Sequence, residues 1–297
     1  MILRQKIVTR YKDWFTENKN NKISINSRAI YKDLSSQIVQ RLNHNLSVTE
    51  ILNWLRNKTV EAFLKKFNKN PELGALNKLI GDWNEFIATS LLSEIVLEMN
   101  RNSPKFIAVF TLPNSRLQKD ESDKVSSKFI SLFSQDEFDS AKGLAKISPF
   151  RNKIFLPSPD YIIVVLSHGD IATSIYPLLE EQVRTPDSLA LYNYFKGKLR
   201  GEDLKAVASL KTSNRPDRRY QPLFEAATIK AMGYALQQNW RYYMVVSELT
   251  TADITIFNTA IAPHGIALEQ DFKLVDGTYK YNKKDDLVSL VEAAIHE

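Results

Sequence analysis

Apolar side chains in the first hundred residues recur at the three- and four-residue spacing of amphipathic helices. One such stretch covers residues 27–42, and a second begins after Ser47-Val48-Thr49-Glu50, which has the form of a helix-initiating capping box. A break at Asn68-Lys69-Asn70-Pro71 separates these stretches from a third, over about residues 79–99. The pattern predicts a helical region at the amino-terminal end of the chain.

The hydrophobic period then changes to short apolar runs that are typical of strands. Strands are expected at residues 106–110, 161–166, 206–211, 242–247 and 254–257. Helices are expected over residues 172–200 with a break near Pro186, over 222–238 and over 287–295, whereas 113–127 reads as a loop. Strands that alternate with helices predict an α/β core with a mixed sheet flanked by helices. We therefore expect an N-terminal helical accessory region over residues 1–70 and a single core over 71–297.

Composition narrows the class of protein. The 297 residues include no cysteine, which excludes disulfides, cysteine-ligated zinc and a thiol nucleophile, and is compatible with a reducing cytoplasm. The sequence has neither an apolar run of membrane-spanning length nor a signal-peptide pattern, so we expect no membrane partner. The net charge of +6 suits a polyanionic partner. Residues 1–70 carry 14 Lys and Arg against 5 Asp and Glu, which fits either contact with phosphates or an ordinary solvated helical surface.

Three polar residues stand at the ends of the predicted core elements. Asp160 follows Pro159 at the start of the YIIVVL run, Lys211 ends the run AVASLK, and Glu225 lies fourteen residues later on the next helix. Two converging carboxylates can hold Mg²⁺, which prefers oxygen ligands, and a nearby lysine can hydrogen-bond an attacking water and offset phosphate charge. Each residue alone has an ordinary explanation as a turn, a solvated strand end or a helix surface charge. The hypothesis of a phosphodiester-cleaving site depends on their joint spacing.

The segment between the lysine and the glutamate adds a second indication. Residues 215–219 read Arg-Pro-Asp-Arg-Arg. Arginine pairs bidentately with guanine, and aspartate accepts from the cytosine amino group, so Arg215, Asp217 and Arg218 are suited to reading G·C pairs in the major groove. The ordinary alternative is an exposed turn with an internal Arg–Asp ion pair.

These motifs together resemble the CCGG-specific type II restriction endonucleases of the PD-(D/E)XK superfamily. Their signature is Pro-Asp, a lysine about fifty residues later, and a glutamate after about thirteen more, and Pro159-Asp160, Lys211 and Glu225 follow it. The recognition segment of these enzymes is similar to residues 209–219, SLKTSNRPDRR. The chain departs from the wider superfamily at one position. Members of the superfamily usually have an acidic residue two positions before the catalytic lysine, whereas here Ser209 stands two positions before Lys211.

The resemblance covers roughly residues 75–265 and implies a restriction-endonuclease-like core. Gly81-Asp82-Trp83-Asn84-Glu85 looks like the N-terminal helix motif of the family, which makes Glu85 a further catalytic candidate. The implied activity is Mg²⁺-dependent hydrolysis of double-stranded DNA that leaves 5′ phosphates and four-base 5′ overhangs. A palindromic site implies a two-fold symmetric homodimer, and some relatives form tetramers.

A further hypothesis concerns the base pair outside the CCGG core. The far end of the helix carrying Glu225 is Gln237-Gln238-Asn239, which is followed by Trp240 and Arg241. Asn and Gln pair with adenine whereas Arg prefers guanine, so an amide-rich helix end hints at an outer A·T pair and a site of the form WCCGGW. The alternatives are that the amides cap the helix or face water, or that Arg241 turns inward and favours guanine.

Three other functions remain open from the sequence. Another PD-(D/E)XK nuclease, for repair or for a DNA structure, would share Asp160 and Lys211 without needing the arginine segment. A non-catalytic DNA-binding protein would bind DNA without cutting it. A Ser/His hydrolase is suggested only by Ser167-His168-Gly169-Asp170, which lacks the nucleophile-elbow pattern.

Overall fold

The computed structural model describes residues 13–17, 22–113, 128–139, 143–150, 159–166, 169–212 and 219–296. By compactness the chain divides into two units, Met1–Ile87 and Ala88–Glu297. The division falls inside the helix α4 (Leu73–Asn100), and the boundary expected at residue 70 falls in the link just before that helix.

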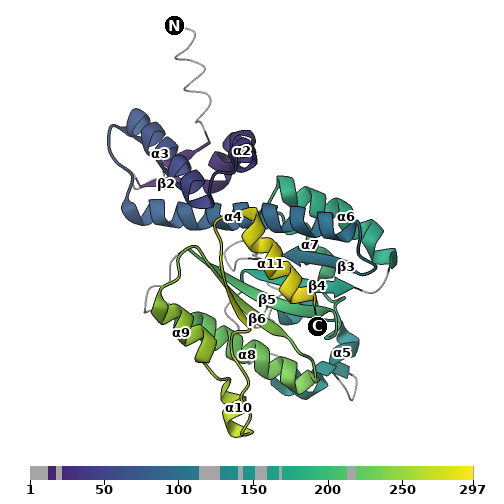
Figure 1. The fold of residues 1–297 in the computed structure, drawn as a ribbon. Helices are drawn as coiled ribbons and strands as arrows, with labels where there is room; N and C mark the ends of the chain where they lie inside the picture. Colours follow the sequence, from purple (N-terminus) through teal and green to yellow (C-terminus); the bar gives the residue numbers. More distant parts are fainter. Residues whose placement is uncertain are drawn as a thin grey trace. The chain divides into compact units, whose positions relative to one another are not determined.

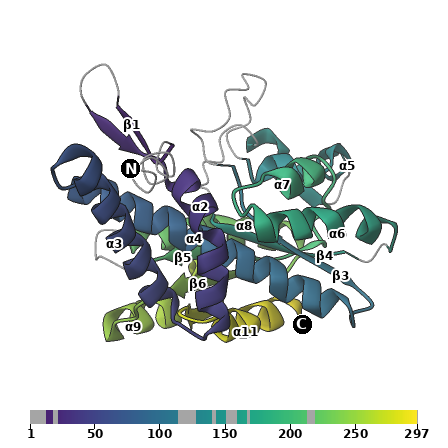
Figure 2. The ribbon, with the colours of Figure 1, turned by 90° about the horizontal axis from the view of Figure 1, so that it is seen from above.

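The first unit contains two packed helices and a small hairpin (Figure 2), besides the first part of α4. They are α2 (Ser27–Asn43), α3 (Val48–Phe67) and the antiparallel strands β1 (Phe15–Glu17) and β2 (Ile23–Ile25). The Ser47 side chain accepts from the amide of Glu50 and the Glu50 carboxylate accepts from that of Ser47, so the predicted capping box is confirmed. The Trp83 indole donates to the Ser27 carbonyl and the Ser27 hydroxyl donates to Asp82, which ties the start of α2 to α4.

The second unit is built on a five-stranded mixed sheet in the order β3-β4-β5-β6-β7 (Figure 1). β3 (Phe106–Phe110), β4 (Tyr161–Leu166) and β5 (Leu204–Lys211) are antiparallel neighbours, and β6 (Arg241–Val246) and β7 (Gly277–Lys280) continue the sheet in parallel with β5. All residues of β3 and β4 are buried, as their continuous apolar runs predict. The expected α/β class with a mixed sheet is confirmed.

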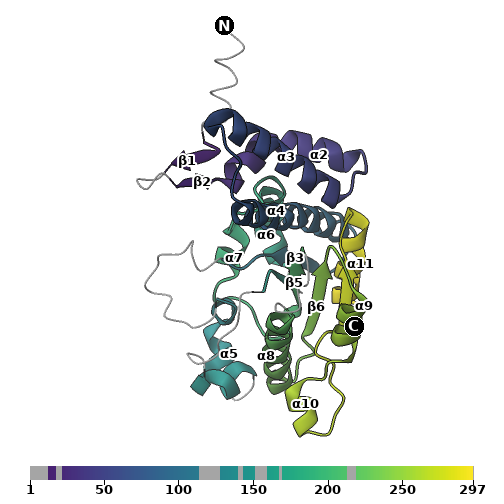
Figure 3. The same cartoon turned by 90° about the vertical axis from the view of Figure 1, so that its left-hand side faces the viewer.

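Helices lie on both sides of this sheet. Figure 3 shows α8 (Tyr220–Leu236) and α11 (Lys284–Ile295) on opposite sides of β5 and β6. The side chains of β6 alternate accordingly, since Tyr242 contacts Glu225 of α8 whereas Tyr243 contacts Ala293 of α11. The remaining elements are the helices α5 (Gln135–Asp139), α6 (Gly169–Arg184), α7 (Ala190–Phe195) and α10 (Pro263–Ala267), and the 3₁₀ segments η1 (Ile130–Leu132) and η2 (Gly143–Phe150).

One element was predicted wrongly. The expected strand at residues 254–257 is part of the helix α9 (Thr251–Thr259). Thr250 and Asp253 form a capping box at its start, and this local hydrogen bonding outweighs the strand preference of the β-branched residues in Ile254-Thr255-Ile256. The burial confirms a helical period, because Asp253 and Phe257, four residues apart, are both buried whereas Ile254 is exposed.

Among the described residues, no helix combines the length and the apolar character needed to cross a lipid bilayer.

Candidate active site

The predicted catalytic residues from β4 and β5 meet at one edge of the sheet. β4 and β5 are antiparallel with Tyr161 opposite Ala208, so the register places Asp160, which precedes β4, beside Ser209 near the carboxyl end of β5. Lys211 is the last residue of β5 and lies on the same face as Ser209, because side chains two apart on a strand share a face.

Three donors converge on one oxygen of Asp160. Its Oδ2 accepts from the amide of Leu210 at 2.6 Å, from Lys211 Nζ at 3.0 Å and from Ser209 Oγ at 3.1 Å. Within the described part of the chain, no hydrogen bond is made to Oδ1. The carboxylate is therefore held in one orientation by its Oδ2, and its second oxygen is available to a ligand.

The third predicted residue, Glu225, is buried beside this pair. Its side chain projects from α8 toward the sheet, where Oε2 accepts a 2.6 Å hydrogen bond from the Tyr242 hydroxyl of β6. Among the described residues, Oε1 is buried without a hydrogen-bond partner. Glu225 is 2% exposed, whereas the side chains of Asp160 and Lys211 are 18% and 22% exposed, so solvent reaches the site from the Asp160–Lys211 side.

Burial raises the pKa of Glu225 to about 8, against the opposing effect of the Tyr242 hydrogen bond. The negative charge of Asp160 raises this pKa further, and the positive charge of Lys211 lowers it. These electrostatic influences require that the two carboxylates and the ammonium group are close neighbours. The structure thus brings Asp160, Lys211 and Glu225 together, as their spacing predicts.

The arrangement fits a divalent cation. Two neighbouring carboxylates each have an oxygen without a hydrogen bond among the described residues, Oδ1 of Asp160 and Oε1 of Glu225. A cation between them would neutralise the carboxylate repulsion and give the buried Oε1 a partner. No cluster of three or more His, Cys, Asp and Glu residues in metal-binding geometry occurs in the described ranges. A two-carboxylate site suits Mg²⁺, which usually keeps several waters and substrate phosphates as its other ligands.

The other predicted site residues fall in different places. Glu85 is exposed on α4 within the first unit, and its catalytic role stays a prediction. Arg215, Asp217 and Arg218 lie outside the described residues, which resume at Arg219.

Asn239 and Arg241 lie away from the carboxylates. Asn239 is exposed in the link between α8 and β6. Arg241 begins β6 opposite Ala206, five residues along the ladder from Lys211. Its guanidinium donates to the backbone carbonyls of Ala293 and His296 at the end of α11, on the sheet face that Tyr243 shares. In this structure the Arg241 guanidinium therefore caps the carboxyl end of α11.

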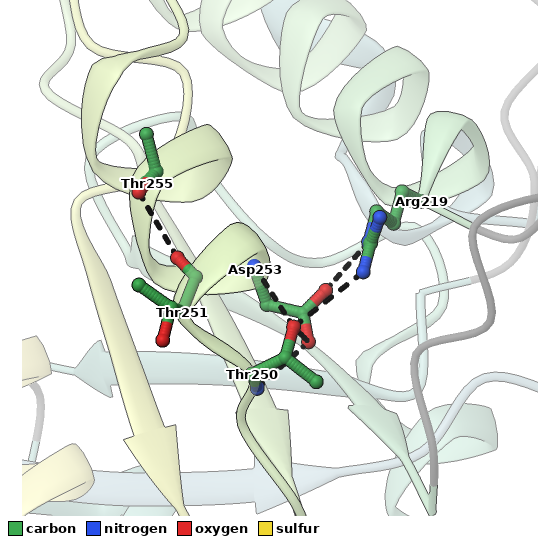
Figure 4. A network of polar contacts seen from close by, with 5 residues as sticks. All are labelled: Arg219, Thr250, Thr251, Asp253 and Thr255. Atoms are coloured by element: carbon green, nitrogen blue, oxygen red, sulfur yellow. Dashed lines mark hydrogen bonds and ion pairs between the residues drawn. The ribbon is translucent and has the colours of Figure 1, made fainter.

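Sequence reasoning missed a polar network around the buried Asp253, drawn in Figure 4. Arg219, immediately before α8, donates to Asp253 of α9 at 2.6 Å, and Asp253 also accepts from the amide and hydroxyl of Thr250. Burial opposes ionisation of Asp253, but these hydrogen bonds and the arginine charge outweigh it and lower its pKa. The capping pattern Thr250-x-x-Asp253 was the available sequence signal.

Sequence reasoning also missed Tyr242. It stands in the apolar run RYYMVV, where a buried tyrosine reads as core packing. No sequence signal identified its role, because the face that it shares with Val207 and Ser209 is set by the pairing of β6 with β5.

Comparison with known proteins gives a consistent result at three levels. The model of a family described as "Cfr10I/Bse634I restriction endonuclease" matches residues 10–297. The type II restriction enzyme Cfr10I of Citrobacter freundii is 27% identical over 291 residues, which cover 91% of this chain and 94% of that enzyme.

Two solved structures share the fold. A crystal structure of the type IIF restriction endonuclease Bse634I with cognate DNA superposes with a TM-score of 0.73 and 21% identity, covering 95% of this chain and 98% of the other. A structure of Bse634I restriction endonuclease gives a TM-score of 0.72 at 21% identity, covering 97% and 99%. The architecture is thus shared over nearly the whole length of both chains.

Proposed function

Because the chain belongs to the Cfr10I/Bse634I restriction endonuclease family, we propose that it cuts double-stranded DNA at a palindromic site with a CCGG core, using Mg²⁺. Membership makes it a site-specific deoxyribonuclease of type II. The observation that carries the proposed metal-dependent hydrolysis is the 3.0 Å contact between Lys211 and Asp160 with the Glu225 carboxylate buried beside it.

The reaction assigned to this site is in-line hydrolysis of a phosphodiester. The oxygen of a water molecule forms a bond to phosphorus as the bond from phosphorus to the 3′ oxygen breaks, which leaves a 5′ phosphate and a 3′ hydroxyl. Asp160 and Glu225 would hold Mg²⁺, which when bound supplies charge stabilisation and acidifies water. Lys211 hydrogen-bonds and orients the attacking water and offsets charge on the phosphate. The hydrogen bonds to Asp160 Oδ2 fix that carboxylate before substrate arrives.

Recognition is assigned to the segment that joins β5 to α8. Arg215 and Arg218 are proposed to read guanines and Asp217 a cytosine. Because this segment begins directly after Lys211, base reading and hydrolysis would be joined through a few residues of backbone. Cleavage before the core on each strand would give four-base 5′ overhangs.

A palindromic site is read by a two-fold symmetric assembly. We propose a homodimer in which each subunit contacts one half-site, or a tetramer of two such dimers. That Bse634I is described with cognate DNA supports double-stranded DNA as the partner.

For the outer base pair we propose A·T, giving WCCGGW, with Asn239 as the candidate reader. The hydrogen bonds of Arg241 to Ala293 and His296 occupy its guanidinium, so Arg241 would have to release them to contact a base. Oligonucleotides carrying each outer pair around CCGG decide the matter: preferred cleavage at outer G·C sites, or indifference to the outer pair, would exclude this specificity.

The deciding experiment for the whole proposal is digestion of a mixed-sequence plasmid with Mg²⁺, followed by sequencing of the cut ends. Discrete fragments that end in a 5′ overhang within CCGG are expected, and EDTA should abolish cutting. A smear would indicate a nuclease without this specificity. Binding in EDTA with no cutting in Mg²⁺ would indicate a non-catalytic DNA-binding protein.

A further inference from the structure

The Tyr242 hydroxyl contacts one of the two carboxylates of the candidate site, donating to Glu225 Oε2 at 2.6 Å. On the adjacent strand the Ser209 hydroxyl donates to Asp160 Oδ2 at 3.1 Å. Tyr242 and Ser209 share one face of the sheet, because Tyr242 pairs in register with Val207 and Ser209 lies two residues further along β5. Each carboxylate therefore has a hydroxyl donor on the same face of the sheet.

The backbone fixes this tyrosine rigidly. Tyr242 is fully buried, and it is the second residue of β6, paired in parallel register with Val207 of β5. Its amide also donates to Asp276 at 2.7 Å. A side chain anchored in this way can act as a fixed support, whereas the glutamate on α8 has several rotatable bonds and, among the described residues, makes no other side-chain hydrogen bond.

We propose that Tyr242 is a positioning residue for the metal-binding carboxylate of Glu225, holding Oε2 so that Oε1 faces the cation site beside Asp160. This inference rests on the proposed magnesium-dependent function. The orphaned Oε1 supports it, because a buried carboxylate with one oxygen bound to a fixed hydroxyl and the other unpartnered has a preferred direction for a ligand. Ser209, on the same face of the adjacent strand, donates to the second carboxylate.

The test compares Tyr242→Phe with Tyr243→Phe. Each change removes one hydroxyl from a buried tyrosine of the same strand, but the Tyr243 hydroxyl donates to the Ala293 carbonyl on the opposite face of the sheet. Mg²⁺ and Mn²⁺ affinity is measured without DNA by titration calorimetry. Loss of an outer-shell hydrogen bond to a metal ligand typically weakens metal binding about 10- to 100-fold, so this loss is expected for Tyr242→Phe and not for Tyr243→Phe.

A second readout separates positioning from general damage. The Mg²⁺ concentration for half-maximal cleavage should rise in Tyr242→Phe, while DNA affinity in EDTA and the thermal unfolding of the two variants stay alike. Equal metal affinity in both variants would overturn the inference and leave the proposed function standing. Failure of the wild-type protein to bind either metal would overturn both.

If Tyr242→Phe does not fold, the inference is tested instead with 3-fluorotyrosine incorporated at position 242 of an otherwise native protein. Its ¹⁹F resonance should move during a Mg²⁺ titration, in step with metal binding, while the same probe at position 243 stays still. A probe at position 242 that does not respond would overturn the inference.

Discussion

Arg219 and Asp253 join the start of α8 to the first turn of α9 through a 2.6 Å hydrogen bond from Nε to Oδ1. Asp253 is fully buried and Arg219 is mostly so. The pair lies where the predicted recognition segment ends, because Arg219 directly follows Arg218. It therefore fixes one end of the segment proposed to read DNA to a rigid part of the fold.

Replacing Arg219 by alanine is expected to destabilise the protein by about 3–5 kcal/mol, since the change leaves Asp253 as a buried charge without its cation. Urea unfolding followed by circular dichroism measures this. Lys58→Ala is the matched control, because it removes the cation of an ion pair on the surface. In that pair the side chain of Lys58 is 44% exposed and that of Glu61 is 70% exposed. That variant should change stability by less than about 0.5 kcal/mol. Similar small effects in both variants would show that Thr250 alone supports Asp253.

Single substitutions at Asp160, Lys211 and Glu225 test the catalytic assignment. Asp160→Ala, Lys211→Ala and Glu225→Gln should each lower single-turnover cleavage by orders of magnitude with an unchanged circular dichroism spectrum, because each removes a ligand or the group that orients water. Glu202→Gln is the control, since that carboxylate pairs with Arg200 on the surface. Near-normal cleavage by any of the three variants removes that residue from the site.

The sequence was sufficient to predict four of the five strands in the sheet that carries these residues. Continuous apolar runs such as YIIVVL identified buried strands, and the capping box of Ser47 and Glu50 located the start of a helix. The helix α9 was missed because alternating Thr and Ile side chains resemble a strand, while its capping interaction depends on Thr250 and Asp253. β7 was missed because GTYK is short and only half-buried, so it has no apolar period.

Some residues of the candidate site could likewise be predicted from the sequence, and others could not. Motif spacing identified Asp160, Lys211 and Glu225, since a strand pair and the following helix leave few other places for them to meet. Tyr242 and Arg219 could not be identified, because their roles depend on contacts between elements far apart in the sequence. Arg241 shows the reverse case: its position after an amide-rich helix end suggested a base reader, whereas its hydrogen bonds go to α11.

Substitution of the predicted base readers separates specificity from phosphate binding. Arg215→Ala or Arg218→Ala should weaken binding to a CCGG duplex about 10- to 100-fold, since one bidentate base contact contributes about 1–3 kcal/mol of discrimination. Binding to random-sequence DNA should change much less. Asp217→Ala should relax discrimination at the cytosine. Competition binding in Ca²⁺ measures these effects, and equal losses on both DNAs would mean that the arginines contact phosphates.

The raised pKa of Glu225, about 8 against an ordinary 4.5, gives the metal-free protein a specific pH dependence. Below pH 4.5 the carboxyl group is protonated in both the folded and the unfolded chain. Between pH 4.5 and 8 the folded chain keeps the proton and the unfolded chain releases it. The contribution of Glu225 to the free energy of unfolding is therefore complete below pH 4.5, decreases above that pH, and is fully lost once the pH has risen through 8. The slope reaches about 1.4 kcal/mol per pH unit.

The experiment compares wild type with Glu225→Gln, because the amide does not titrate while other groups titrate alike in both. In EDTA, the stability of the wild type relative to the variant should fall from pH 5 to pH 8. Mg²⁺ requires the ionised carboxylate, so the stabilisation that it adds to the wild type should grow over the same interval and be much smaller in the variant. A stability difference that does not change with pH would mean that Glu225 is already ionised in the folded protein, with Tyr242 and Lys211 sufficient to hold its charge.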